Sequence, residues 1–349
     1  MMPYGQDTQI IDAPYVVFYI RGIFGILWFW GKDRKRGINM DEIYINKAKS
    51  FVDFMLIQQQ WSGISRREVD KWLTNFQGMT DDEIKLIYKL LTNIIYYSEK
   101  DVTDVLKEGV FNCVAYDKIL NAQKNNKFSF SQKALRNIYE EELHASCFVP
   151  LLDKNSPHES GNYVTRLLVQ QGIVPSNLSM FIDQVPAVLK SCNIRRLIIV
   201  DDCVGSGQQL TDFWGKRKVF ADGKVMTIQE MCKKYGIDAY YLTLFGYDQS
   251  IKDLKDKFSD LNIICVRFLR NQHRVFSDDS YIWKDAEERD KAIEVLSSLT
   301  KNAGIPLLGY RNLDFAFIMH QTIPDWSLPL FWKENNDWNL LVRRKNSND

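Results

Sequence analysis

Four apolar segments in the second half of the chain alternate with segments of helical periodicity, and this alternation constrains the fold most strongly. The apolar segments are CFVPLLD (147–153), RLIIV (196–200), AYYLTLFGY (239–247) and NIICVRFL (262–269). A strand that is apolar along its whole length is buried on both faces, which is typical of parallel sheets with helices on each side. We therefore expect residues 145 to about 335 to form an α/β, doubly wound, mostly parallel sheet. Among its helices, residues 178–192 are predicted to form one that bends at Pro186.

The residues that precede the sheet are predicted to form helices. Ser65 with Glu68, and Thr80 with Glu83, each match a capping box, in which two residues satisfy each other's backbone N–H groups at a helix start. Apolar residues follow both boxes at helical spacing, so one face of each helix is expected to be buried. Residues 123–133 (QKNNKFSFSQK) are predicted to be a polar connector.

This pattern divides the chain into three parts. They are an N-terminal extension over residues 1–39, a helical region over residues 40–144, and the sheet domain over residues 145–349. The last part is expected to end in a lid packed by tryptophans, namely Trp326, Trp332 and Trp338.

The N-terminal extension contains an apolar run, Pro14–Gly31, that Arg21 interrupts. A membrane span needs about 20 apolar residues, and a central arginine costs about 2.5 kcal/mol or more on insertion, so we do not expect a span here. Three interpretations stay open for this part: a membrane segment, a buried or β-rich extension, and sequence upstream of a natural start at Met40.

Composition excludes several classes of protein. The 45 basic and 44 acidic residues give a formal charge of +1, so the chain has no global nucleic-acid signature. Its six cysteines include no C-x-x-C pair and its four histidines none at i, i+4 spacing, which predicts neither a disulfide framework nor a bound structural metal. A reduced, cytoplasmic setting fits this cysteine usage.

The segment RRLIIVDDCVGSGQQL (195–210) carries the clearest functional signal. Asp201 and Asp202 follow a predicted buried strand, and ligands of open parallel sheets collect at such strand ends. Gly205 and Gly207 allow close backbone approach where a helix is expected to start. The N–H groups that can then converge on one phosphate belong to Gly205, Ser206, Gly207, Gln208 and Gln209.

Two carboxylates beside a phosphate repel it unless they face sugar hydroxyls or a bridging Mg²⁺ ion. A ribose phosphate satisfies both the carboxylates and the loop. The alternative is purely structural, because Asp202 or Ser206 can serve as the cap of a helix that follows a core strand. That alternative leaves Asp201 without a role.

The same residues resemble the phosphoribosyl pyrophosphate signature of type I phosphoribosyltransferases, in which a hydrophobic strand leads to two acids and a phosphate loop. The resemblance implies that Asp201 and Asp202 are the catalytic pair that binds the ribose hydroxyls, that residues 205–209 cradle the 5′-phosphate, and that Mg²⁺ is the cofactor. Members of that family usually carry small hydroxyl residues where this chain has Gly205 and Gln209, so a phosphate contact is lost at each.

A second loop fits the same plan. The family grips pyrophosphate with a loop after the first core strand, and here the segment 151–166 offers Ser160, Gly161 and Arg166. The alternative is an ordinary turn followed by a solvated arginine on a helix.

A wider resemblance links the chain to a divergent group of phosphoribosyltransferase-like proteins of prokaryotic conflict systems. It runs over about residues 60–344, from the Val69–Phe76 helix through the S-G loop and the DD-x-x-G-S-G turn to a C-terminal tail. The tail positions are Pro324, Leu328, Pro329, Trp332 and Trp338. The resemblance implies an effector of a phage-defence module, with a protein partner in a defence complex.

Two functional hypotheses follow. One is an enzyme of glycosyl transfer or nucleotide breakdown at ribose C1, with phosphoribosyl pyrophosphate or a nucleotide as ligand. The other is a non-catalytic nucleotide sensor or interaction module. Residues 270–285 are a further lid or binding-loop candidate through Arg270, His273 and Arg274, with a solvated loop as the alternative. We do not assign catalysis to His320.

Overall fold

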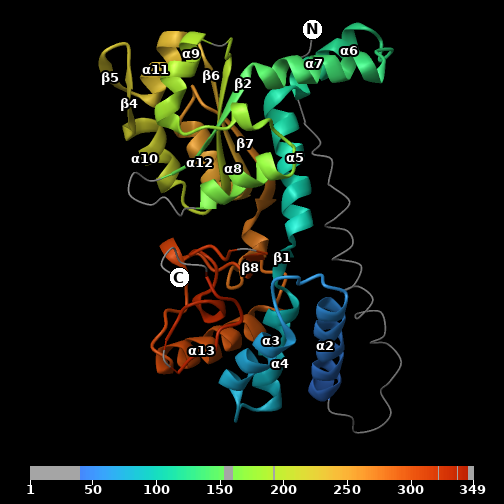
Figure 1. The fold of residues 1–349 in the computed structure, drawn as a ribbon. Helices are drawn as coiled ribbons and strands as arrows, with labels where there is room; N and C mark the ends of the chain where they lie inside the picture. The colour runs from blue at the N-terminus through green and yellow to red at the C-terminus, as the bar shows by residue number, and fades with distance from the viewer. Residues whose placement is uncertain (1–39, 153–159, 192, 321, 336, 345–349) are drawn as a thin grey trace, which may run out of the picture.

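The computed structural model describes residues 40–152, 160–191, 193–320, 322–335 and 337–344 (Figure 1). The predicted extension over residues 1–39, with its apolar run, lies outside them. Within the described ranges, no helix is both long and apolar enough to cross a membrane.

The centre of the fold is a four-stranded sheet whose strands are all parallel, in the order β2-β3-β6-β7. The strands are β2 (Ser146–Pro150), β3 (Arg196–Val204), β6 (Asp238–Tyr247) and β7 (Asn262–Leu269). The predicted α/β doubly wound class is therefore confirmed. β3 runs four residues beyond the predicted end at Val200, so Asp201 and Asp202 lie within the strand.

Helices cover both faces of this sheet. Side chains alternate along β3, so Ile198 and Val200 pack on one face while Leu197 and Ile199 pack on the other. The first face is covered by α5 (Glu99–Val114) and α8 (Ser160–Gln170). The second face is covered by α9 (Val185–Ser191), α10 (Gln208–Lys216), α11 (Ile228–Tyr235) and α12 (Asp248–Lys257).

The prediction of a helix bent at Pro186 is wrong. A 3₁₀ turn over Ile182–Gln184 comes first, and α9 begins at Val185. Pro186 thus lies in the first turn of α9, where a backbone N–H has no partner within the helix and a proline is tolerated. A small antiparallel hairpin, β4 (Lys218–Ala221) with β5 (Lys224–Thr227), joins α10 to α11.

A second lobe, here called the base lobe, forms below the sheet in Figure 1. Its helices are α2 (Met40–Ile57), α3 (Arg66–Leu73), α4 (Asp81–Thr92) and α13 (Ala286–Asn302). Both predicted capping boxes are confirmed, at the starts of α3 and α4.

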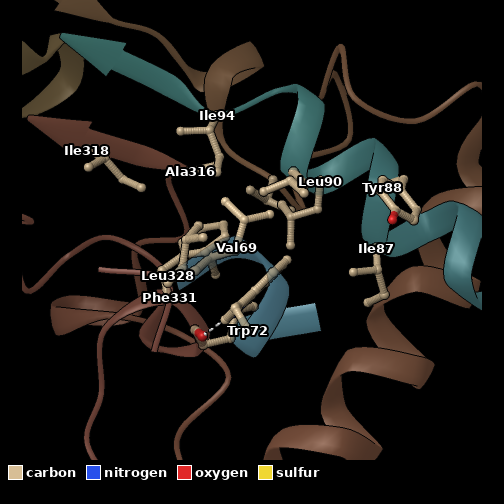
Figure 2. Close-up of a cluster of buried hydrophobic side chains, with 14 of the residues drawn as sticks. Val69, Trp72, Ile87, Tyr88, Leu90, Ile94, Ala316, Ile318, Leu328 and Phe331 are labelled. Atoms are coloured by element: carbon tan, nitrogen blue, oxygen red, sulfur yellow. Dashed lines mark hydrogen bonds between the residues drawn. The ribbon is translucent and has the colours of Figure 1, made fainter. Parts of the chain in front are cut away.

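The base lobe has one core, built from both ends of the described chain. Figure 2 shows Val69 and Trp72 of α3 and Leu90 of α4 against Leu328 and Phe331 of the C-terminal region. The buried Trp72 Nε1–H donates to the carbonyl of Leu330 at 2.9 Å, and Trp338 Nε1–H donates to the same oxygen at 2.9 Å. The Val69–Phe76 helix and the C-terminal tail therefore stabilise each other.

A two-stranded parallel sheet joins the two lobes. Its strands are β1 (Ile95–Tyr97) and β8 (Phe317–Met319). Tyr97 and Phe317 pack into the core of the sheet lobe, where both contact Phe245 at the end of β6. Tyr96 and Ile318 face the base-lobe core instead. We call this β1/β8 pair the joint.

Two helices extend sideways from the sheet lobe (Figure 1). They are α6 (Tyr116–Asn125) and α7 (Gln132–His144), and α6 has no buried residue. The predicted polar connector over residues 123–133 is shorter in the structure, because its ends are helical and only residues 126–131 link the two helices.

Candidate functional site

The DD-x-x-G-S-G turn lies at the carboxyl end of β3, a central strand. β3 pairs with β6 up to Val204 and Gly246, and α10 begins at Gln208, three residues after Gly205. Carboxyl ends of parallel strands are where open α/β sheets bind ligands. The predicted site thus lies at this edge of the sheet, where Ser206 and Gln208 are exposed and Asp201 and Asp202 are buried.

Gly207 is required by the geometry of this turn. It has φ +71° and serves as the N-cap of α10, and a Cβ on it would lie 2.8 Å from Cδ1 of Leu254. Both the left-handed backbone and the contact with α12 therefore exclude a side chain. The glycine brings the start of α10 close to the end of β3.

The backbone of this turn has donors available. Ser206 and Gln208 are exposed, and the N–H groups of Ser206 and Gly207 have no acceptor among the described residues. The Gln208 N–H is 3.5 Å from Oγ of Ser206, a long contact. An N-terminal helix turn with open N–H groups suits an anion.

Gly205 lies under the indole of Trp326. A Cβ on Gly205 would be 2.3 Å from Cδ1 of Trp326, so no side chain fits there. Trp326 is 4% exposed, stacks on Phe317 of the joint at 5.3 Å and meets Phe315 edge-on. The tryptophan predicted as part of a lid therefore covers one side of the turn, while Ser206 and Gln208 stay exposed.

Asp201 is bound within the protein interior. It is 3% exposed and lies on the same face as Leu197 and Ile199, where Tyr241 Oη donates to its Oδ2 at 2.7 Å. Burial, and then the neighbouring charge of Asp202, raises the pKa of Asp201 well above its usual value. Both of its oxygens accept hydrogen bonds within the protein, because the N–H of Asp202 donates to its Oδ1 at 3.0 Å.

Asp202 is also buried, at 5% exposed, and its side chain lies close enough to Asp201 for its charge to raise the pKa of that residue. Its Oδ1 accepts the N–H of Cys203 at 2.8 Å. Burial, and then the charges of Glu99 and Asp202, raise the pKa of Tyr163 on α8 to about 12, against the opposing charge of Arg166. The two acids therefore differ in the groups that they bind, since Asp201 accepts from Tyr241 and Asp202 accepts from the backbone of Cys203.

The S-G pair predicted to grip pyrophosphate lies at the start of α8. Gly161 is in the first turn of this helix, and a Cβ on it would be 2.4 Å from the carbonyl oxygen of Leu151. The pair is therefore part of a helix packed on the chain just after β2. Arg166 is exposed on α8, 5.9 Å from the ring of Tyr163. Residues 153–159, which precede the pair, lie outside the described residues.

Arg166 also lines a pocket of about 410 Å³ on the outer side of α8. The other wall of this pocket includes Ser179, Met180 and Phe181. None of residues 201–209 lines it, so this pocket is separate from the turn after β3.

Two basic side chains of the 270–285 loop, those of Arg274 and His273, are occupied by contacts within the protein. Arg274 Nε is 2.5 Å from Oδ1 of the buried Asp314, and His273 Nδ1 accepts the N–H of Arg270 at 2.8 Å. His320 lies at the joint, with its Nδ1 3.2 Å from Oγ of Ser62 and its Nε2 3.7 Å from Glu99. These contacts give structural roles to Arg274 and His320.

Sequence reasoning missed two tyrosines at the site. Tyr241 binds Asp201, and the hydroxyl of Tyr163 is buried with no hydrogen-bond partner among the described residues. Tyr241 stands in an apolar strand beside Tyr240, and nothing in its spacing singles it out. Tyr163 follows the S-G pair by two residues, which is the one signal that could have found it.

The described His, Cys, Asp and Glu side chains do not form a metal site by themselves. Within the described ranges, no three His, Cys, Asp or Glu side chains form a group that could hold a metal ion. Burial, and then the charges of nearby carboxylates, raises the pKa of the Cys203 thiol well above its usual value, so this thiol is no ligand or nucleophile.

Comparison with known proteins agrees with this geometry. The PRTase-CE family model matches residues 69–344. Curated proteins give no significant match, and solved structures give none either. Because the family match covers well over half of the chain, the protein belongs to the PRTase-CE family, which is of the phosphoribosyltransferase type.

Proposed function

We propose that the protein binds a ribose 5-phosphate ligand, either phosphoribosyl pyrophosphate or a nucleotide, at the turn between β3 and α10. The observation that carries this proposal is that the N–H groups of Ser206 and Gly207 are open at the start of α10. Asp202 lies nearby in the chain, at the end of β3. The helix dipole contributes about 0.3–2 kcal/mol, whereas millimolar binding needs about 4 kcal/mol. Several direct N–H bonds to the phosphate supply the remainder.

In this proposal the two acids have different roles. Asp202 accepts hydrogen bonds from the ribose hydroxyls, while Asp201 holds the strand end in place through Tyr241. Two bonds support this division, because the N–H of Asp202 and the hydroxyl of Tyr241 already occupy both oxygens of Asp201.

Magnesium enters with the ligand. A Mg²⁺ ion prefers substrate phosphates plus one or two carboxylates, and Asp202 is the carboxylate that could share it. The ion would offset the negative charge of a diphosphate leaving group. Phosphate fixation and the carboxylate beside the ring would then hold ribose C1 for attack and favour positive charge on the sugar.

A sensor without turnover is the second candidate, and one observation favours it. The indole of Trp326 fills the space of a side chain at residue 205, so the turn cannot carry the hydroxyl that the type I enzymes usually have there. The ligand then has fewer contacts to its phosphate.

A matched pair of isosteric variants tests the site. Asp202→Asn should weaken binding of phosphoribosyl pyrophosphate or nucleotides about 10- to 100-fold, because a charge-assisted hydrogen bond contributes about 1.5–3 kcal/mol. Asp201→Asn should change affinity less than about threefold, since its amide can still bond Tyr241. Calorimetric titration measures both.

If Asp202→Asn and Asp201→Asn lower the affinity equally, the division of roles between the two acids is contradicted. If none of these ligands binds saturably, the proposed ribose 5-phosphate site is contradicted. Mass spectrometry of the same mixtures separates the two candidates. A new ribosyl product that Asp202→Asn does not form indicates an enzyme, whereas binding with no product indicates a sensor.

We also propose that the protein is an effector of a prokaryotic defence module. The family match and the resemblance of the turn and tail support this role. Expression of the chain with its neighbouring genes should lower phage plating in a bacterial host, and Asp202→Asn should restore it. Equal plating with both forms would contradict the proposal.

A further inference from the structure

The α6–α7 pair forms a helical arm that leaves the body of the protein (Figure 1). We define this arm as residues 116–144. It has no buried residue in α6 and only Glu142 and Leu143 in α7, both close to the sheet. The far end of the arm, residues 123–136, contributes no side chain to the base-lobe core or to the core on either face of the sheet. A surface that does not stabilise the fold is available to a partner.

The far end of the arm is strongly cationic, unlike the chain as a whole. No acidic residue occurs over residues 118–139, and the whole chain has a formal charge of only +1. Lys118 is paired with Glu142 at the near end of the arm. The other four cations are exposed and form no ion pair among the described residues; they are Lys124, Lys127, Lys133 and Arg136.

An exposed aromatic residue, Phe128, lies between these cations in the sequence. Phe128 is 68% exposed, and both Lys127 and Phe128 have left-handed backbone, at φ +52° and +59°. This conformation is disfavoured for residues with a side chain. The turn is nevertheless held, since Phe128 N–H donates to the carbonyl of Gln123 at 2.7 Å and Phe130 N–H donates to its side chain at 3.3 Å. The ring therefore projects from an ordered turn and not from a frayed end.

We propose that the far end of the arm, residues 123–136, binds single-stranded nucleic acid. Unpaired cations supply contacts to phosphates, and an exposed ring supplies a face on which one base stacks. The amide of Asn125, which is exposed near Phe128 in the sequence, adds a hydrogen-bond donor and acceptor. This surface is independent of the turn after β3.

An anionic membrane is the competing partner for such a surface. Stable attachment to a bilayer needs a broad apolar helix face or a second anchor. The far end of the arm exposes one large apolar side chain, Phe128, while Phe130 and Leu135 are partly buried. One ring is enough to stack a base but too little to anchor a helix, so the nucleic acid is favoured.

Fluorescence anisotropy with labelled 20-nucleotide DNA and RNA single strands tests the proposal on the full chain. With four phosphate contacts, the slope of log K against log salt should be about −2.8, which corresponds to about 50-fold weaker binding at 200 mM than at 50 mM salt. The variant K124Q/K127Q/K133Q should reduce this slope to about −0.7. The matched variant K218Q/K224Q/K233Q removes three exposed lysines on and beside the β4/β5 hairpin and should leave the slope unchanged.

Phe128→Ala separates stacking from charge. It should weaken single-strand binding about 5- to 100-fold while the salt slope stays at about −2.8. Equal losses in the two triple-lysine variants would overturn the proposal. So would binding to phosphatidylserine vesicles without binding to the oligonucleotides, or no binding to either strand at 50 mM salt.

Discussion

Substitution of Gly205 by alanine is the sharpest test of how the C-terminal tail meets the turn after β3. The added Cβ would lie 2.3 Å from Cδ1 of Trp326, whereas packed carbons lie about 3.5–4.0 Å apart, so one group must move by more than about 1 Å. Trp326 cannot yield easily, because it is buried, stacked on Phe317 and edge-on to Phe315. Overpacking of this kind costs about 1–3 kcal/mol, and the rigid neighbours place the expected loss near the upper end.

Urea denaturation followed by circular dichroism measures the change in the free energy of unfolding. Gly215→Ala is the matched control, since this residue is in the last turn of α10 and a Cβ there meets nothing within 4 Å. It should raise stability by up to about 1 kcal/mol through helix propensity. In a Trp326→Leu background, Gly205→Ala should lose most of its penalty. If Gly205→Ala and Gly215→Ala prove equally stable, the indole does not lie on the turn and the reasoning fails.

Two further predictions concern the same strand end. Because burial raises the pKa of Asp201, its contribution to stability is fully present below the unfolded pKa of about 3.9 and is lost as pH rises through the folded pKa. The stability of Asp201→Asn relative to the wild type should therefore increase with pH in a denaturation series from pH 4 to pH 8, and a constant difference would refute this. Gly207→Ala should destabilise more than Gly236→Ala, by about 1–3 kcal/mol of overpacking, because both residues have positive φ but only Gly207 lies against Leu254. Equal losses in thermal or urea unfolding would show that this contact yields freely.

Much of the sheet lobe could be predicted from local sequence. Segments that are apolar throughout predicted all four parallel strands, and in the base lobe the boxes at Ser65 and Thr80 predicted two helix starts. These signals are local because a buried strand or a cap needs only its own neighbours. The joint could not be predicted this way, since Ile95 pairs with Phe317 across more than half of the chain and each strand has only three residues.

The candidate site was predictable in place but not in detail. The pair of acids and the two glycines predicted a turn at a strand end, and the structure has that turn. The different partners of Asp201 and Asp202 depend on β3 continuing past Val200, which the apolar pattern did not indicate. Gly205 in place of a hydroxyl residue was the one local sign of Trp326, a neighbour that only the folded tail provides.

The joint also limits how this protein can be divided. Its alternate side chains belong to different cores, so Tyr97 and Phe317 would lose their neighbours if the sheet lobe were removed, and Tyr96 and Ile318 would lose theirs if the base lobe were removed. Fragments cut at either strand would each expose a row of unpaired backbone groups together with apolar side chains. The described chain is therefore expected to unfold in a single cooperative step, and its halves should be recovered only when they are produced together.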